Sequence, residues 1–132
     1  MKRYDLKKDK HWFADYCIES IIIRDNDIFI YISREDVKAV IICNRYIGIE
    51  YLGNWEDVII KYAVIRSNGE LVHKSLDTIK EKYNTKYLTN PKYNLDWIKT
   101  EWRLLEIVFT DGMKIEIACK EAFCESIEEA SN

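Results

Sequence analysis

The sequence contains little glycine or proline and no long apolar run. Four of its 132 residues are glycine and one is proline, so turns must be formed largely by Asn and Asp. The longest run without a charged residue is six residues, which excludes a transmembrane helix, because such a helix needs about 20 apolar residues. No apolar segment follows the charged stretch 1–10, so we expect no secretory signal.

Residues and motifs for catalysis or cofactor binding are also scarce. The two histidines, His11 and His73, belong to no local nucleophile and base motif. Zinc sites usually contain Cys or His pairs separated by about two to four residues, and the nearest match, Cys119 with Cys124, would point to opposite faces of a strand. Glycine-rich phosphate loops and dense acidic calcium loops are absent. We therefore expect no enzyme, no metal and no cofactor, and keep an enzyme using Cys and His as a third alternative.

The four cysteines favour reduced, buried thiols. Cys17, Cys43 and Cys119 lie inside apolar runs, where a free Cys packs as a small hydrophobe, whereas the sequence leaves the role of Cys124 undecided. Two disulfides are the alternative, and they would be typical of an exported chain. Without a secretory signal, we expect free thiols and a cytoplasmic location.

The dominant pattern is that of β-strands. Runs of β-branched and aromatic residues alternate with turn residues, as in antiparallel sheets. Asn68-Gly69 predicts a hairpin turn into a short strand at 71–74, and Ser75 is a candidate N-cap for an amphipathic helix at 75–84. The expected strands are 17–24, 28–33, 37–43, 46–52, 56–66, 71–74, 97–109 and a last one from 113.

The hairpin around Thr110-Asp111-Gly112 has two possible registers. A two-residue turn would place Glu106 in an apolar row. A three-residue turn, with Gly112 in the left-handed conformation, gathers six apolar residues on one face, so we predict this register. Its pairs are Phe109 with Met113, Ile107 with Ile115 and Leu105 with Ile117, with Lys114 and Glu116 on the other face.

Several strands are apolar on both faces, notably 37–43 and 58–65, so both faces need cover. One helix of about ten residues cannot supply it, which favours a sheet folded on itself. We predict an α+β fold, a mostly antiparallel sheet of about seven to eight strands forming a sandwich or a partly open barrel, with one short helix near 75–84. Residues 1–132 are expected to form a single domain, with a candidate mobile arm at 1–11 and a candidate mobile acidic tail at 126–132.

The aromatic residues and the acidic end suggest a protein-binding surface. Trp, Tyr and Phe make up 13% of the chain, and those in expected loops either pack beneath the loops or anchor a partner. The stretch 111–132 carries six carboxylates against two lysines, which suits a basic protein partner. The candidate partner-binding residues are Trp12, Phe13, Asp15, Trp55, Glu121, Glu125, Glu128 and Glu129.

The segment 80–94 supports a different partner. Its lysines alternate with tyrosines, and stacking rings beside ammonium groups suit single-stranded nucleic acid. Sparse arginine and a net charge of −3 disfavour this alternative. Its candidate residues are Lys80, Lys82, Tyr83, Lys86, Tyr87, Lys92 and Tyr93.

Two segments resemble small bacterial β-rich proteins that include immunity proteins, which neutralise a toxin by binding it. "WFADYCIESIIIRDNDIFIYI" is similar to their Phe-His-Asp-x-x-Ile turn and first hairpin, and "EIVFTDGMKIEIACKEAFCE" to their closing hairpin. Phe13, Asp15 and Ile18 match the opening motif, whereas Ala14 replaces its His. The resemblance implies binding without turnover. We therefore expect a cytoplasmic, non-enzymatic protein that binds a protein partner, such as a basic toxin domain.

Overall fold

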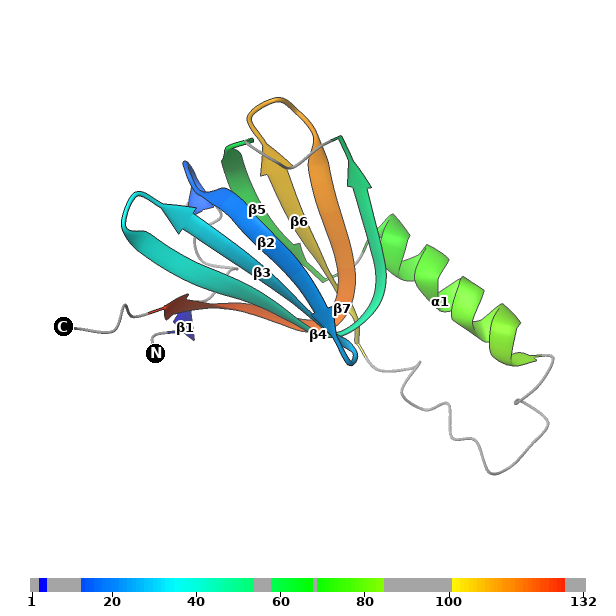
Figure 1. Ribbon diagram of the computed structural model, residues 1–132. Helices are drawn as coiled ribbons and strands as arrows, with labels where there is room; N and C mark the ends of the chain where they lie inside the picture. The colour runs from blue at the N-terminus through cyan, green and yellow to red at the C-terminus, as the bar shows by residue number, and fades with distance from the viewer. Residues whose placement is uncertain (1–2, 5–12, 54–57, 68, 85–100, 128–132) are drawn as a thin grey trace.

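The computed structural model describes residues 3–4, 13–53, 58–67, 69–84 and 101–127. They form one antiparallel sheet in the order β2-β3-β4-β7-β6-β5, with β1 pairing with β7, and one helix, α1, beside it (Figure 1). The mostly antiparallel α+β fold predicted from the sequence is confirmed. The elements are β1 (Arg3–Tyr4), β2 (Cys17–Arg24), β3 (Asp27–Arg34), β4 (Val37–Leu52), β5 (Ile60–Arg66), α1 (Glu70–Asn84), β6 (Arg103–Phe109) and β7 (Lys114–Ile127).

Strand β4 is a single long strand, although the sequence suggested two strands separated at Asn44-Arg45. Arg45 has a φ of 50°, and its backbone N–H donates a hydrogen bond to Asp27 Oδ1 at 3.0 Å. The next N–H, of Tyr46, donates to the carbonyl of Asn26 at 2.9 Å. These bonds fix a bend in β4 beside the start of β3, so β4 pairs with both β3 and β7 before the bend and, among the described residues, with β7 alone after it.

The two outermost strands of the sheet, β2 and β5, meet at one end. Cys17 forms an antiparallel bridge with Ile59. The N–H of Asp15 donates to the Ile60 carbonyl at 3.0 Å, and the Ile60 N–H donates to the Tyr16 carbonyl at 2.8 Å. We call this contact the seam. It joins the two edges of the sheet over a short distance, in agreement with the predicted partly open barrel.

The helix begins at Glu70, five residues before the predicted start, so the prediction of a strand at 71–74 is wrong. The His73 N–H donates to the Gly69 carbonyl, which makes this segment the first helical turn and not the return strand of a hairpin. Leu71 and Val72 are buried against the sheet. The negative carboxylate of Glu70 in the first turn interacts favourably with the positive end of the helix dipole. Ser75, the predicted N-cap, lies in the middle of the helix and is buried.

The closing hairpin has the predicted register. The Phe109 N–H donates to the Met113 carbonyl at 2.9 Å, the Gly112 N–H donates to the Phe109 carbonyl at 3.0 Å, and Gly112 has a φ of 90°. Ile107 pairs with Ile115 and Leu105 with Ile117. Five of the six apolar side chains are buried, but Met113 is 42% exposed because it lies at the end of the hairpin.

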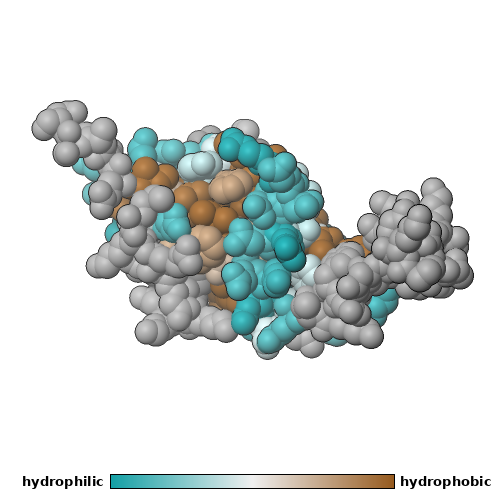
Figure 2. Space-filling view, turned by 90° about the horizontal axis from the view of Figure 1, so that it is seen from below, coloured by the Kyte–Doolittle hydropathy of each residue, from teal (hydrophilic) through white to brown (hydrophobic). Residues whose placement is uncertain are grey.

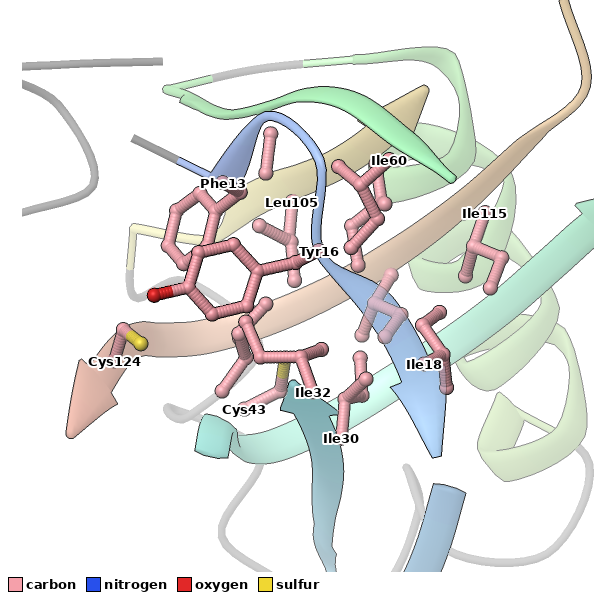
Figure 3. Close-up of a cluster of buried hydrophobic side chains, with 14 of the residues drawn as sticks. Phe13, Tyr16, Ile18, Ile30, Ile32, Cys43, Ile60, Leu105, Ile115 and Cys124 are labelled. Atoms are coloured by element: carbon pink, nitrogen blue, oxygen red, sulfur yellow. The ribbon is translucent and has the colours of Figure 1, made fainter. Parts of the chain in front are cut away.

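Two groups of buried side chains stabilise the fold. The larger fills the inside of the curved sheet and includes Phe13, Tyr16, Ile30, Cys43 and Leu105 (Figure 3). The smaller lies between α1 and the opposite face of the sheet, where Leu71, Val72, Trp102, Leu104 and Ala118 pack together. The helix therefore covers the part of the outer face formed by β4, β6 and β7.

The predicted terminal segments fall partly on described residues. Arg3–Tyr4 form β1 and pair with Glu125 and Cys124 of β7, and residues 126–127 form the end of β7. The rest of 1–11 and of 126–132 lies outside the described residues. No helix in the described part of the chain is long and apolar enough to span a membrane.

Candidate functional site

A row of large apolar side chains crosses the outer face of the sheet where α1 does not cover it. Residues of β3 alternate between the two faces, with Ile28, Ile30 and Ile32 buried inside. Phe29 therefore points outward. It pairs with Ile22 of β2 on one side and with Ile42 of β4 on the other, and Ile42 pairs with Phe123 of β7. We call these four residues, Ile22, Phe29, Ile42 and Phe123, the outer apolar row.

Two of the predicted acidic residues flank this row. Glu121 and Glu125 lie two residues to either side of Phe123 on β7, so the three side chains share a face. Glu121 is exposed and pairs across the sheet with Asn44. Glu125 is half-buried and pairs with Val40, which pairs in turn with Tyr31. The structure thus brings together two predicted carboxylates and a set of apolar and aromatic residues.

The outer apolar row is accessible enough to contact a partner. Ile22 is 38% exposed, and Phe29, Ile42 and Phe123 are half-buried. Figure 2 shows a patch of hydrophobic residues beside a band of hydrophilic residues. An apolar centre surrounded by polar residues is the usual composition of a protein-binding surface, and patches of this kind on single chains are often functional.

A row of carboxylates crosses the outer face on the other side of the bend in β4. Glu50 pairs with Glu116, and Glu116 pairs with Glu106 on its other side. Like charges at opposed positions repel, and each carboxylate has a cation beside it. The ion pairs are Lys74–Glu50 at 2.9 Å, Lys114–Glu116 at 3.2 Å and Arg66–Glu106 at 3.5 Å.

The hydrogen bonds within these pairs affect the lysines. The bond to Glu50 raises the pKa of Lys74, and the bond to Glu116 raises the pKa of Lys114. Both lysines are exposed enough that solvent screens the pairs. The carboxylate row is therefore locally neutralised, and the acidic character of this face is weaker than its glutamates suggest.

Phe13, a predicted partner-binding residue, is a core residue. Its side chain is fully buried, with its ring centroid 6.4 Å from that of Tyr16. The Arg34 guanidinium lies over the Tyr16 ring at 4.8 Å and donates to the Ala14 carbonyl at 3.4 Å. Asp15 is exposed, with a φ of 73°. The opening motif therefore turns the chain into the seam, and of its residues only Asp15 could contact a partner.

The other predicted site residues are only partly described. Trp12, Trp55, Glu128 and Glu129 lie outside the described residues. Of the nucleic-acid alternative, Lys80 is exposed on α1, and Lys82 and Tyr83 belong to the last turn of the helix. The remaining members, Lys86, Tyr87, Lys92 and Tyr93, lie outside the described residues.

Three of the four thiols lie in the core. Cys43, Cys119 and Cys124 are fully buried, whereas Cys17 is half-buried at the seam. A hydrogen bond with Cys119 and burial raise the pKa of Cys43, and burial raises the pKa of Cys124 to about 12. A thiol held neutral is a poor nucleophile and a poor metal ligand. In the described segments no three His, Cys, Asp or Glu side chains gather into a metal-binding group.

Sequence reasoning missed the outer apolar row. The segment 37–43 is apolar on both faces, which predicts that both faces are covered; in the structure Ile42, on the outer face, is only half-buried. Ile42 lies between Phe29 and Phe123 because of the register between neighbouring strands. The pattern of residues within one strand does not contain this register. Comparisons with family models, with curated proteins and with solved structures gave no match to this chain.

Proposed function

We propose that this chain is a non-enzymatic protein-binding protein of the immunity or inhibitor type, which acts in the bacterial cytoplasm and neutralises a toxin by direct binding. The observation that carries the proposal is the position of Phe123 between Glu121 and Glu125, in one cross-strand row with Ile42 and Phe29. The apolar row supplies area to bury, and the two carboxylates bias the surface toward a basic partner.

The composition of this face supports binding in preference to catalysis. Aromatic side chains at the centre of an interface contribute most of the binding free energy. Carboxylates at its rim contribute mainly to the rate of association, because they attract a basic partner before contact. The opening and closing segments that resemble immunity proteins are those that build the seam and the β6–β7 hairpin.

The test is neutralisation of a candidate toxin domain, taken from the C-terminus of a large secreted protein where the preceding gene encodes one. The chain is co-expressed with that domain, and growth is measured for the wild type, for the double variant Glu121→Lys/Glu125→Lys and for Phe123→Ala. We expect the wild type to restore growth. With purified proteins at low salt, the charge reversal should slow association by roughly tenfold or more, and Phe123→Ala should mainly speed dissociation.

The matched control is the double reversal Asp77→Lys/Glu81→Lys. It makes the same change in net charge at two exposed positions on α1, so it should leave the association rate within about twofold of the wild type if local charge decides the rate. Equal slowing by both double variants would mean that only net charge matters. No rescue of growth by the wild-type chain would contradict the immunity function itself.

A further inference from the structure

Among the described residues, the second half of β4 has an open edge. β3 pairs with β4 only as far as Cys43, because the β2–β3 hairpin turns at Asp25-Asn26 and β4 bends at Arg45. From Ile47 to Leu52, β7 is the one strand that pairs with β4 among the described residues. In an antiparallel strand every second residue directs its N–H and C=O away from a given neighbour. This edge therefore presents backbone donors and acceptors in the spacing of a β-ladder.

The helix α1 forms the second wall of a groove along this edge. The groove has a volume of about 310 Å³, and its lining residues in the described part of the chain all belong to β4 and α1. In Figure 1 the first part of α1 lies beside this half of β4, and the helix then runs away from the sheet at an angle. The lining residues from β4 are Ile47 to Glu50, and those from α1 are Leu71, Lys74, Ser75, Thr78 and Ile79.

The lining combines apolar side chains with small hydroxyl groups. Ile47, Leu71 and Ile79 offer apolar contact, and Thr78 donates a 2.9 Å hydrogen bond to the Lys74 carbonyl of its own helix. The Lys74–Glu50 ion pair joins the two walls. Its side chains are 66% and 51% exposed, so the pair is weak and its opening would cost an incoming chain little. The groove has no uncompensated charge and suits alternating small apolar side chains.

The position of α1 argues against a second copy of the chain as the occupant. Antiparallel pairing of two β4 edges about a two-fold axis would set the strands about 4.8 Å apart. The two helices would then lie on the same face, each beside the open edge of its own strand. Packed helix axes need about 8–10 Å. Two copies of α1 would therefore compete for one space, whereas a single extended segment brings no second helix to this edge.

We propose that the groove between β4 and α1 binds an extended, uncharged segment of a partner polypeptide, which adds as a strand to the edge Ile47–Leu52. Backbone hydrogen bonds to β4 supply affinity, and alternate side chains enter the groove against Ile79 and Leu71. This site lies on the opposite side of the β4 bend from the outer apolar row, and it stands or falls independently of the toxin partner.

The first experiment selects peptides from a phage-displayed library of random seven-residue segments. Selection is run against three proteins: the wild type, Thr78→Trp, which fills the groove from an exposed helical position, and Asp77→Trp, which places the same bulk on an exposed neighbour outside the lining. We expect one family of alternating apolar peptides to enrich on the wild type and on Asp77→Trp. Its affinity for Thr78→Trp should be at least tenfold weaker. No enriched family, or equal binding to all three proteins, would overturn the proposal.

The second experiment does not depend on the folding of any variant. A synthetic peptide of the selected sequence is compared with versions N-methylated at alternate amides, in two sets of opposite parity. Strand addition requires one set to lose binding by tenfold or more and the other to retain it. NMR hydrogen exchange should show new protection at amides within 47–52. Equal binding by both methylated sets, protection elsewhere, or dimerisation through this edge would refute strand addition.

Discussion

At the scale of single residues, position in the sequence and position in the fold diverge most clearly at Phe13 and Asp15. Only Ala14 lies between these two residues in the sequence. Their position in an aromatic-rich segment before the first strand predicts that both are exposed. The turn within the opening motif instead directs Phe13 into the barrel, whereas Asp15 stays outside and its N–H donates a hydrogen bond to the Ile60 carbonyl. The sequence does not contain this outcome, because the partner of the turn, Ile60, lies 45 residues further along the chain.

The thiols give a prediction at the same scale. Burial raises the pKa of Cys124 from 9.0 to about 12, so neutral Cys124 stabilises the folded state fully below pH 9, and this contribution is lost as the pH rises toward 12. We expect the free energy of unfolding to fall over this range, with a smaller slope in Cys124→Ala. The measurement is urea unfolding from pH 7 to 11.

The internal control for this prediction is the neutral range. Between pH 7 and 8 the Cys124 thiol is protonated in both folded and unfolded chains, so the variant and the wild type should show parallel pH dependence there, whatever the cost of the deleted sulfur. If the stability curves of the wild type and of Cys124→Ala also stay parallel above pH 9, the pKa of Cys124 does not differ between the folded and unfolded states.

At the scale of elements, the contact between α1 and β4 depends on a close approach at Gly48. A Cβ atom added there would meet the Ser75 hydroxyl oxygen. We expect Gly48→Ala to lower the free energy of unfolding by about 1–3 kcal/mol through overpacking. The double variant Gly48→Ala/Ser75→Ala should recover part of this loss, because the nearest remaining side-chain atom would lie 3.3 Å away.

Chemical unfolding of the four members of this double-mutant cycle measures the coupling. Ser75→Ala alone supplies the reference for the lost hydroxyl. Additive effects of the two substitutions would show that the added Cβ and the Ser75 hydroxyl do not interact. The helix would then have moved away from β4, which would mean that it is loosely docked.

The elements also show which parts of a fold a sequence can predict. The β6–β7 hairpin was predicted with its register because Gly112 and the alternation on both sides of it are local signals. The helix start was missed because Leu71 and Val72 in "LVHK" fit a strand as well as a helix. What decides between them is burial against Trp102 and Leu104, residues that are distant in the sequence. The outer apolar row was missed for the same reason.

At the scale of the whole molecule, the seam closes the sheet through few bonds. In the described part of the chain, the hydrogen bonds of Asp15 and Ile60 join the two outer strands at one end, whereas β4 and β7 pair over almost their full lengths. Local opening of the seam should therefore cost less than global unfolding. We expect the amides of Asp15 and Ile60 to exchange at least about 100-fold faster than the central amides of β4 and β7, such as Ile41 and Ile117.

Native-state hydrogen exchange followed by NMR tests this expectation. The exchange rates are compared after correction for intrinsic rates, and small amounts of urea distinguish local from global opening. Exchange of the seam amides as slow as that of the central strands would show that the barrel opens only by complete unfolding.

The long pairing of β4 with β7 also has a consequence for how quickly the chain can fold. This ladder joins residues 38–52 to residues 114–127, so the centre of the sheet forms only when two segments more than 60 residues apart find each other. Hairpins such as β2–β3 and β6–β7 can form early, but they remain separate until this ladder assembles. Chains dominated by such distant pairings fold over milliseconds to seconds. During that interval the unpaired edges of β4 and β7 are exposed, which makes the speed of this single step decisive for the yield of folded protein.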